Sequence, residues 1–239
     1  MNRFIKTAFG RLLLVNVVAF VALHVAAFAA HGSWFMPFVG VSASDFHWWT
    51  VLTYMFAHLD LLQLLFNMLW LYWFGDLFMT LGTERQMLFL YVAGGIVGAL
   101  AYLLLATVGV AHGLLLGASA SILAIVVGVA WRMPNFSVNL LLLGSVAIKW
   151  IALVLVLLSV ISLSGENFGG NVAHLGGALT GAIYGIIMRH GGFSIRHVKR
   201  EPKSDSERMD TLLTKVRRSG YASLTSGERR DLIELSKKI

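Results

Sequence analysis

Residues 117–132 read GASASILAIVVGVAWR, an apolar run that is too short for an ordinary membrane-spanning helix. The fifteen residues before Arg132 make a helix of about 22 Å, because an α-helix rises about 1.5 Å per residue. The hydrocarbon core of a bilayer is about 30 Å thick. A helix with Arg132 at one membrane surface would therefore begin below the other surface, where its free backbone N–H groups need water or protein. The run predicts a water-filled pocket beside Gly117, Ala118 and Ser119.

The composition indicates that this run belongs to a membrane protein. Of the 239 residues, 57% are hydrophobic and only 13% are charged, whereas roughly 25% are charged in an average soluble domain. Apolar runs of about 20 residues cross a bilayer as helices, and five further runs with few or no charges raise the predicted number of spanning helices to six. These runs are 12–30, 61–78, 87–110, 150–163, which can be extended back to about residue 138, and 171–188.

The basic residues predict the orientation of these helices. With the N-terminus inside, the outer segments 31–60, 111–116 and 164–170 contain no Lys or Arg, so all 19 basic residues fall inside, as the positive-inside rule requires. A cleavable signal peptide is the alternative for residues 12–30, because residues 27–29 read Ala-Phe-Ala and resemble a cleavage site. This run of nineteen residues is longer than the about 7–15 residues of a signal h-region, so we predict an uncleaved anchor.

Charge divides the chain into parts. Residues 1–188 contain eleven charged side chains, whereas residues 189–239 contain twenty. A basic tail after a membrane domain indicates retention in the cytoplasm, and we expect no nucleic-acid partner. We predict a transmembrane domain at 1–188, a polar linker at 189–206 and a basic cytoplasmic tail at 207–239.

The pattern of the tail predicts a small helical hairpin. Apolar residues at positions 209, 212, 213 and 216 have helical spacing, and Gly220 is a stop signal for this first helix. Thr225-Ser226-Gly227-Glu228 matches the capping-box pattern that begins a second helix. Two roles are open for the hairpin: an appendage for retention and solubility, or a docking site for a partner.

Two stripes of small residues predict which polar side chains meet in the bundle. The last run carries glycine at every fourth position, the short fourth run carries a matching stripe, and such stripes let two helices approach closely. His174 shares the face of the glycines and Ser119 adjoins the other stripe, so packing would place the two together. A hydroxyl beside an imidazole is a nucleophile–base pair, and a helix N-terminus favours an oxyanion. The stripes are Gly177, Gly181 and Gly185, and Ala120, Ala124 and Gly128.

Other membrane chemistries lack the residues that they need. The chain has no Cys, which excludes disulfides, Cys-ligated zinc, iron–sulfur clusters and thiol nucleophiles. The sequence contains no H-E-x-x-H pattern of a zinc protease, no P-loop and no dinucleotide fingerprint. Only Asp76 lies near the interior of an apolar run, so no carboxylate pair is available for aspartyl catalysis. We therefore expect neither a cofactor nor a metal ion.

Four motifs occur in a fixed order along the chain. They are His58, Gln63 and Asn67; Phe74-Gly75, Leu81-Gly82 and Leu90-Tyr91; Gly117-Ala118-Ser119-Ala120; and Ala173-His174 followed by Gly177 and Gly181. The first matches H-x-x-x-x-H-x-x-x-N, the third G-x-S-x and the fourth A-H-x-x-G-x-x-x-G. With these motifs the chain resembles the rhomboid intramembrane serine proteases over about residues 10–190.

The resemblance implies a catalytic dyad without a third acid, in which Ser119 attacks the peptide bond and His174 acts as base and then as acid. It implies an oxyanion hole formed by the Ser119 backbone N–H, the Asn67 side-chain amide and the position of Gln63, while His58 matches a structural motif residue. The implied substrates are membrane-spanning helices of other proteins. We expect an all-α, six-helix rhomboid-like bundle in the bacterial inner membrane, with both termini in the cytoplasm.

Three residues depart from the family pattern. Gln63 stands where a second His is usual, although Gln also donates N–H bonds. Ala120 replaces a Gly that commonly follows the nucleophile, and Met79 stands where a Glu is common. Gln63 and Ala120 support an alternative function: a non-catalytic rhomboid-like adaptor that binds transmembrane helices.

Overall fold

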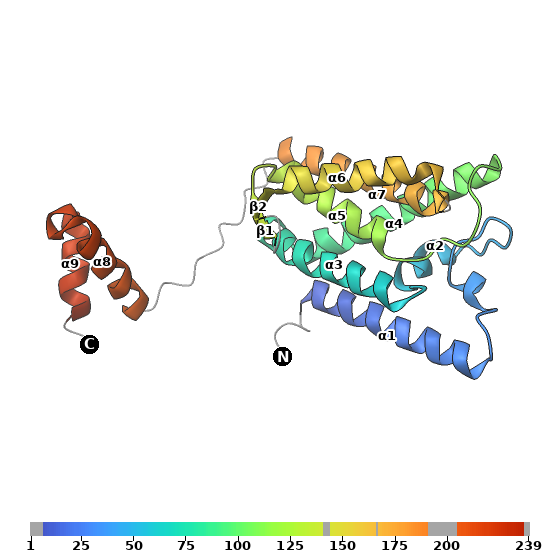
Figure 1. The fold of residues 1–239 in the computed structure, drawn as a ribbon, viewed down its shortest axis with the longest axis horizontal. Coiled ribbons are helices and arrows are strands. Elements are labelled where there is room, and N and C mark those ends of the chain that lie inside the picture. The colour runs from blue at the N-terminus through green and yellow to red at the C-terminus, as the bar shows by residue number, and fades with distance from the viewer. Residues whose placement is uncertain (1–6, 141–143, 166, 191–204, 237–239) are drawn as a thin grey trace. The chain divides into compact units, whose positions relative to one another are not determined.

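A computed structural model of the chain describes residues 7–140, 144–165, 167–190 and 205–236, and most of them are helical (Figure 1). The helices and strands are α1 Ala8–Ala29, η1 Met36–Phe38, α2 Thr50–Thr53, η2 Tyr54–Phe56, α3 Leu61–Leu81, α4 Glu84–Thr107, α5 Ser119–Arg132, β1 Ser137–Leu140, β2 Gly144–Ala147, α6 Ile148–Ile161, η3 Ser162–Ser164, α7 Phe168–His190, α8 Asp205–Ser219, η4 Tyr221–Ser223 and α9 Ser226–Ser236, where η marks a 3₁₀-helix.

The chain forms two compact units, residues 1–196 and residues 197–239. The first unit contains helices α1 to α7 and the second contains α8 and α9. The predicted linker at 189–206 lies mostly outside the described residues. Each of the two units is helical on its own.

Four helices of the first unit, α1, α3, α4 and α7, are long and apolar enough to cross a membrane. The helices α5 and α6 contain 14 residues each, which gives about 21 Å at the usual rise of an α-helix. α5 is short, as residues 117–132 predicted. The count of six spanning helices stays a prediction, since length and composition identify four candidates within the described residues.

A small β-hairpin corrects the all-α prediction. β1 pairs antiparallel with β2, with Val138 opposite Val146, whereas the sequence analysis allowed the fifth apolar run to begin near residue 138. β-branched residues at both strand centres favour an extended backbone. Gly144 has a φ of +70°, a conformation that glycine adopts without steric cost. The helix α6 therefore begins only at Ile148.

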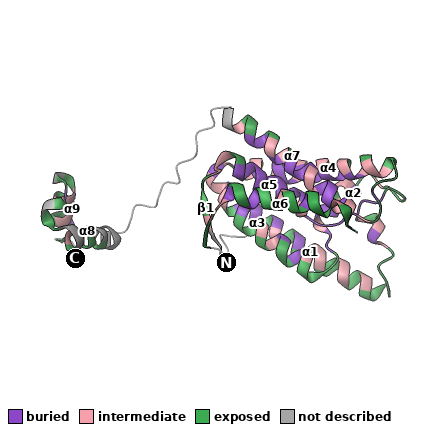
Figure 2. Ribbon diagram, turned by 45° about the horizontal axis from the view of Figure 1, so that its top comes forward, coloured by how far each residue is buried: buried purple, intermediate pink, exposed green. Residues whose placement is uncertain are grey.

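The helix α5 forms the centre of the first unit. Every residue of α5 from Ala120 to Ala130 is buried, and Figure 2 shows the buried residues concentrated on this helix and the faces turned towards it. A helix that is hydrophobic on all sides is stable only when its neighbours surround it. Contacts with α3, α4, α6 and α7 provide this cover.

The predicted packing of the two small-residue stripes is confirmed. A Cβ atom added to Gly177 would overlap the carbonyl oxygen of Ala120, and one added to Gly181 would overlap the carbonyl oxygen of Ala124. The backbones of α5 and α7 are therefore in direct contact, as expected for helices that carry facing stripes of small residues. This contact fixes the depth of α7 relative to the start of α5.

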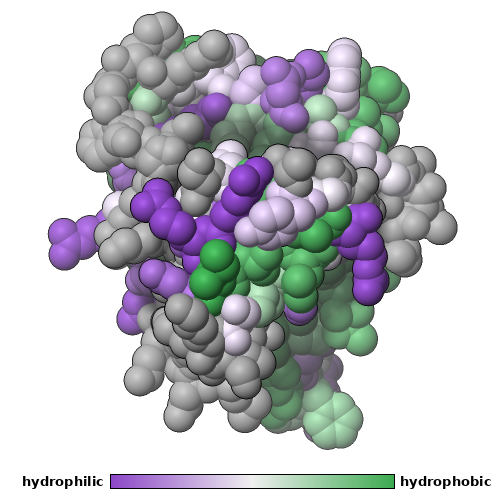
Figure 3. Space-filling view, turned by 90° about the vertical axis from the view of Figure 1, so that its left-hand side faces the viewer, coloured by the Kyte–Doolittle hydropathy of each residue, from purple (hydrophilic) through white to green (hydrophobic). Residues whose placement is uncertain are grey.

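The second unit consists of two amphipathic helices. α8 ends before Gly220, which has a φ of +79°, and α9 begins with a capping box in which the Thr225 N–H donates to Glu228 Oε2 at 2.8 Å and the Glu228 N–H donates to Thr225 Oγ1 at 3.3 Å. Lys215 on α8 donates to Glu228 at 2.7 Å, and Leu224 and Leu235 are buried. Figure 3 colours the described residues of the whole chain by hydropathy, and both strongly hydrophilic and hydrophobic side chains reach the drawn surface.

Candidate active site

The loop before α5 holds Ser119 at the first position of this helix. Gly117 has a φ of +113°, which favours glycine, and its N–H donates to the Tyr54 carbonyl at 2.9 Å. A Cβ atom at Gly117 would lie 2.8 Å from Gln63 Nε2, so the loop also needs glycine for space. Leu115 forms a β-bridge with Val41. These contacts fix the turn that begins α5.

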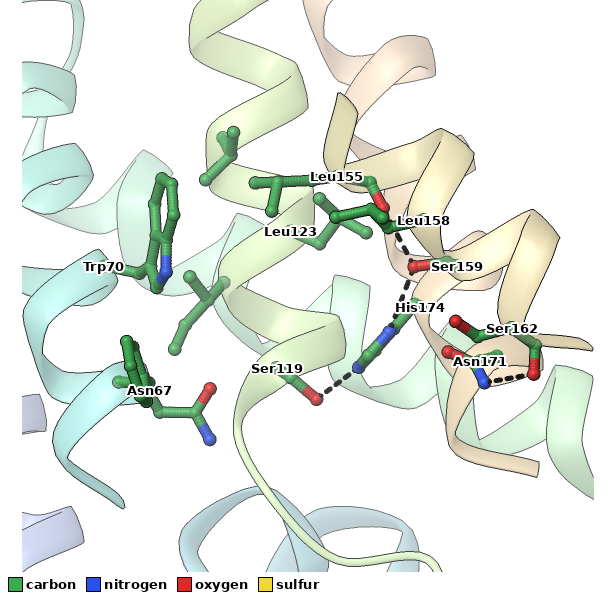
Figure 4. Close-up of a pocket in the computed structure, with 13 residues that line it drawn as sticks. Asn67, Trp70, Ser119, Leu123, Leu155, Leu158, Ser159, Ser162, Asn171 and His174 are labelled. Carbon is green, nitrogen blue, oxygen red and sulfur yellow. Dashed lines mark hydrogen bonds between the residues drawn. The ribbon is translucent and has the colours of Figure 1, made fainter. Parts of the chain in front are cut away.

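The structure brings Ser119 and His174 together. Ser119 Oγ lies 2.6 Å from His174 Nε2, from residues 55 positions apart in the chain (Figure 4). His174 lies one turn before Gly177 on α7, and the close contact of Gly177 with Ala120 sets the imidazole beside the start of α5. The hydroxyl and the imidazole thus have the geometry of a nucleophile and its general base.

The second ring nitrogen of His174 contacts a serine that the sequence analysis did not single out. Ser159 Oγ on α6 lies 3.2 Å from His174 Nδ1 and donates to the Leu155 carbonyl at 3.0 Å. Figure 4 shows Ser119, His174 and Ser159 as one chain of hydrogen bonds. The available signal was one of two hydroxyls in the apolar run 150–163, the other being Ser162, and it was weak because serine in a helix usually bonds to its own backbone.

Asn67 supplies an unpaired donor near the serine. Asn67 on α3 is buried, and its Nδ2 has no hydrogen-bond partner within the part of the chain that the structure describes. It lines the same two cavities as Ser119 and His174. A buried amide without an acceptor is costly, and this amide points into the space where a substrate carbonyl would meet Ser119 (Figure 4).

Gln63 lines the cavity beside Gly117 and Ser119, but its side chain already makes hydrogen bonds within the protein. Its Nε2 donates to the Leu116 carbonyl at 3.3 Å and its Oε1 accepts from the Leu59 N–H at 2.8 Å. Asp60 caps α3 by accepting from the Gln63 backbone N–H at 2.8 Å. Because an amide nitrogen carries two hydrogens, one N–H of Gln63 remains for the cavity beside Gly117.

Two cavities meet at Ser119 and His174. One of about 270 Å³ extends towards Gly117 and Gln63, and this volume suffices for several waters, each of which takes about 30 Å³ in the liquid. The other, of about 300 Å³, lies between α3, α5, α6 and α7. Its lining consists of Phe66, Asn67, Trp70, Ser119, Ile122, Leu123, Val126, Leu155, Leu158, Ser159, Ser162, Asn171 and His174.

Among the described residues, no carboxylate lines either cavity, and no group of three His, Cys, Asp or Glu side chains has the arrangement of a metal site. The polar groups at the site are therefore neutral hydroxyls, amides and one imidazole. The cavity between α3, α5, α6 and α7 is lined mainly by apolar side chains, whereas the cavity beside Gly117 has a larger share of polar groups.

Three further residues that the sequence analysis discussed are His58, Ala120 and Met79. Each of them packs into the fold without a steric clash. His58 is fully buried outside the lining of both cavities, and burial lowers its pKa to about 4. The methyl group of Ala120 faces Gly98 on α4, so that helix leaves room for it. Met79 packs against the hydrophobic core from within α3.

The sequence is similar to known proteins of one family. The family model of the rhomboid domain matches residues 45–191. A zebrafish (Danio rerio) protein, presenilin-associated rhomboid-like protein A, mitochondrial, is 31% identical over 136 residues. These residues make up 54% of this chain and 34% of the relative, so the chain spans about a third of the length of that protein.

Proposed function

Because the chain belongs to the rhomboid family, we propose that it is an intramembrane serine endopeptidase that cleaves transmembrane segments of other membrane proteins. The observation that carries this proposal is the 2.6 Å contact between Ser119 Oγ and His174 Nε2. The contact lies at the junction of an apolar cavity with a second cavity that can hold water. A peptide hydrolase needs access for both the substrate chain and water.

The proposed reaction begins with attack of Ser119 Oγ on the carbonyl carbon of the scissile peptide bond. His174 Nε2 takes the hydroxyl proton, and the carbonyl oxygen becomes an oxyanion. Its donors are the Asn67 side-chain amide, the second N–H of Gln63 and the Ser119 backbone N–H, which has no acceptor within α5 because it belongs to the first turn of the helix.

The intermediate then collapses and the peptide C–N bond breaks. His174 gives its proton to the leaving amine, which leaves Ser119 bound as an ester to the other part of the substrate. Water attacks this ester, with His174 again as the base. The products are two peptides, and the reaction requires no cofactor.

The proposal also includes the orientation of the protein in the membrane. Arg11 pairs with Glu84 at 3.5 Å, and Arg132 donates to the Leu81 carbonyl at 2.7 Å, so basic residues of α1 and α5 both lie at the end of the bundle away from Ser119. The positive-inside rule supports a cytoplasmic position for this end. We propose a six-helix integral protein of a bacterial inner membrane, with both termini cytoplasmic.

A serine-directed fluorophosphonate probe tests the proposal. The purified full-length protein in detergent should be labelled and should cleave a model transmembrane helix, and both activities should be lost in Ser119→Ala. His174→Ala should also lose cleavage while its melting temperature stays close to that of the wild type. A folded wild type that neither reacts with the probe nor cuts a panel of helices would favour the alternative function, a non-catalytic adaptor that binds transmembrane helices.

A further inference from the structure

We propose that Ser159 is a positioning residue for the proposed base: its hydroxyl fixes the orientation and the tautomer of His174. The inference rests on the proposed function, which it deepens by adding a third member to the pair of Ser119 and His174. Ser159 is 5% exposed, and its Oγ lies 3.2 Å from His174 Nδ1. It belongs to α6, whereas the other two residues belong to α5 and α7.

The direction of the hydrogen bonds follows from the atoms involved. A serine hydroxyl has one hydrogen and two lone pairs. In the arrangement that we propose, the Ser159 hydroxyl gives its hydrogen to the Leu155 carbonyl, at 3.0 Å, and accepts a hydrogen bond from His174 Nδ1, at 3.2 Å. Nδ1 then carries the hydrogen, and the unprotonated Nε2 faces Ser119 Oγ at 2.6 Å. This is the tautomer that can remove a proton from Ser119.

The same contact assists the reaction after proton transfer. When Nε2 accepts the proton of Ser119, the imidazolium has a hydrogen on both nitrogens, and the one on Nδ1 already has an acceptor in Ser159. In hydrolases with a carboxylate behind the histidine, the acid orients the ring and stabilises its cation. Within the described residues no carboxylate lines this site, and Ser159 supplies a neutral acceptor in the corresponding place.

A second hydrogen bond between α7 and the end of α6 helps to fix the position of Ser159 relative to His174. Asn171 on α7 donates to the Ser162 carbonyl at 2.9 Å, one turn beyond Ser159 and one turn before His174. Figure 4 shows this link beside the hydrogen bond between Ser159 and His174. Two separate contacts thus join the helices where the base is held, so Ser159 meets the ring in a fixed geometry.

A matched pair of variants separates the hydroxyl from its volume. Thr and Val have nearly the same shape, but only Thr keeps an acceptor oxygen. Ser159→Val should lower kcat about 10-fold to 100-fold, the usual effect of removing a group that orients a catalytic side chain, while KM stays within about twofold. Ser159→Thr should retain kcat within about threefold of the wild type. Ser164→Ala, an exposed hydroxyl in η3, is the control and should behave as wild type.

The fluorophosphonate rate gives a second readout, because this small probe reacts with Ser119 without a bound substrate helix. Ser159→Val should slow labelling in parallel with kcat, and Ser159→Thr should not. A Ser159→Val protein with wild-type kcat and labelling rate would overturn the inference while leaving the proposed function intact. Equal losses in Ser159→Val and Ser159→Thr would also overturn it, since they would show a packing role. A wild type that neither labels nor cleaves would refute both proposals.

Melting temperatures of the same detergent preparations show whether each variant is folded. If Ser159→Val fails to fold, Ser159→Ala replaces it, because alanine removes the acceptor without adding volume. The expected result is unchanged: loss of kcat at constant KM. A folded Ser159→Ala with wild-type kcat contradicts the inference.

Discussion

At the scale of single residues, Asn67 and Gln63 supply the two side-chain amides of the proposed oxyanion hole, and their surroundings differ. The Asn67 amide nitrogen is buried and has no partner in the described part of the chain, whereas Gln63 bonds to Leu116 and Leu59. An amide without a ground-state partner gains its bond only when an oxyanion forms. Such a donor lowers the barrier of the reaction rather than the free energy of substrate binding.

We therefore expect Asn67→Ala to cost more than Gln63→Ala. Removing one oxyanion donor typically lowers kcat about 10²-fold to 10³-fold, which is our expectation for Asn67→Ala at unchanged KM. Gln63→Ala should lower kcat about 10-fold to 100-fold, because its amide already donates to Leu116 and contributes less. Initial rates with one fluorogenic helix substrate measure both. Full activity of Gln63→Ala would remove Gln63 from the oxyanion hole.

His58 makes the stability of the protein depend on pH. Burial lowers its pKa from 6.5 to about 4, so between these values the unfolded chain binds a proton that the folded protein does not. The free energy of unfolding therefore falls as pH drops from about 6.5 to about 4, by at most about 3 kcal/mol. His58→Gln should lose this dependence. Melting temperatures in detergent between pH 7 and 4 test it, and parallel curves for both proteins would contradict it.

The sequence predicted the partners whose position follows from regular helix geometry, and it missed the one that depends on a third helix. Ser119 starts a short helix and His174 shares a face with Gly177, so two stripes of small residues predict their meeting. Ser159 differs, because the rotation of α6 against α7 depends on a connection that includes η3 and the bond from Asn171 to the Ser162 carbonyl. Periodicity alone does not give that rotation.

At the scale of elements, the backbone contact of α5 with α7 has a measurable consequence. A methyl group at Gly181 would overlap the Ala124 carbonyl oxygen, which neither helix can avoid by a rotamer change. We expect Gly181→Ala to destabilise the fold by about 1–3 kcal/mol, the usual cost of overpacking. Gly32→Ala has open space around its new methyl group and should stay within about 0.5 kcal/mol of the wild type.

Thermal unfolding in one detergent compares the two glycine variants. Equal melting temperatures for Gly181→Ala and Gly32→Ala would show that the helices separate more easily than this contact implies. Gly177→Ala extends the experiment, because Gly177 lies one turn from His174. That variant should lose cleavage activity even where it remains folded.

The short hairpin of β1 and β2 shows where hydropathy was insufficient. The sequence between Arg132 and Ile148 is apolar enough to continue the next span, and the prediction allowed a start near residue 138. Hydropathy does not distinguish an apolar strand from an apolar helix, whereas β-branched Val138 and Val146 and the left-handed Gly144 do. The backbone preferences of these residues, rather than their hydropathy, predict the two strands.

At the scale of the whole molecule, the proposed orientation in the membrane rests on the distribution of charge and can be measured directly. The chain has no Cys, so a single introduced thiol reports its own location. Ser164→Cys should react with a membrane-impermeant maleimide added outside intact cells, whereas Asn135→Cys should react only after lysis. Both positions are exposed, which makes their access comparable. The reverse pattern would place the tail on the outer side.

The burial of α5 has a further consequence for the response to the bilayer. Hydrophobic mismatch acts on helices that face lipid, and α5 is enclosed from Ala120 to Ala130, whereas the long helices such as α1 expose apolar side chains. We therefore expect a thicker membrane to shift the level of Ser119 below the surface without altering its distance to His174. For a protease of the proposed kind, lipid chain length would set where a substrate helix is cut, and the enclosed helix would keep the rate of cutting constant.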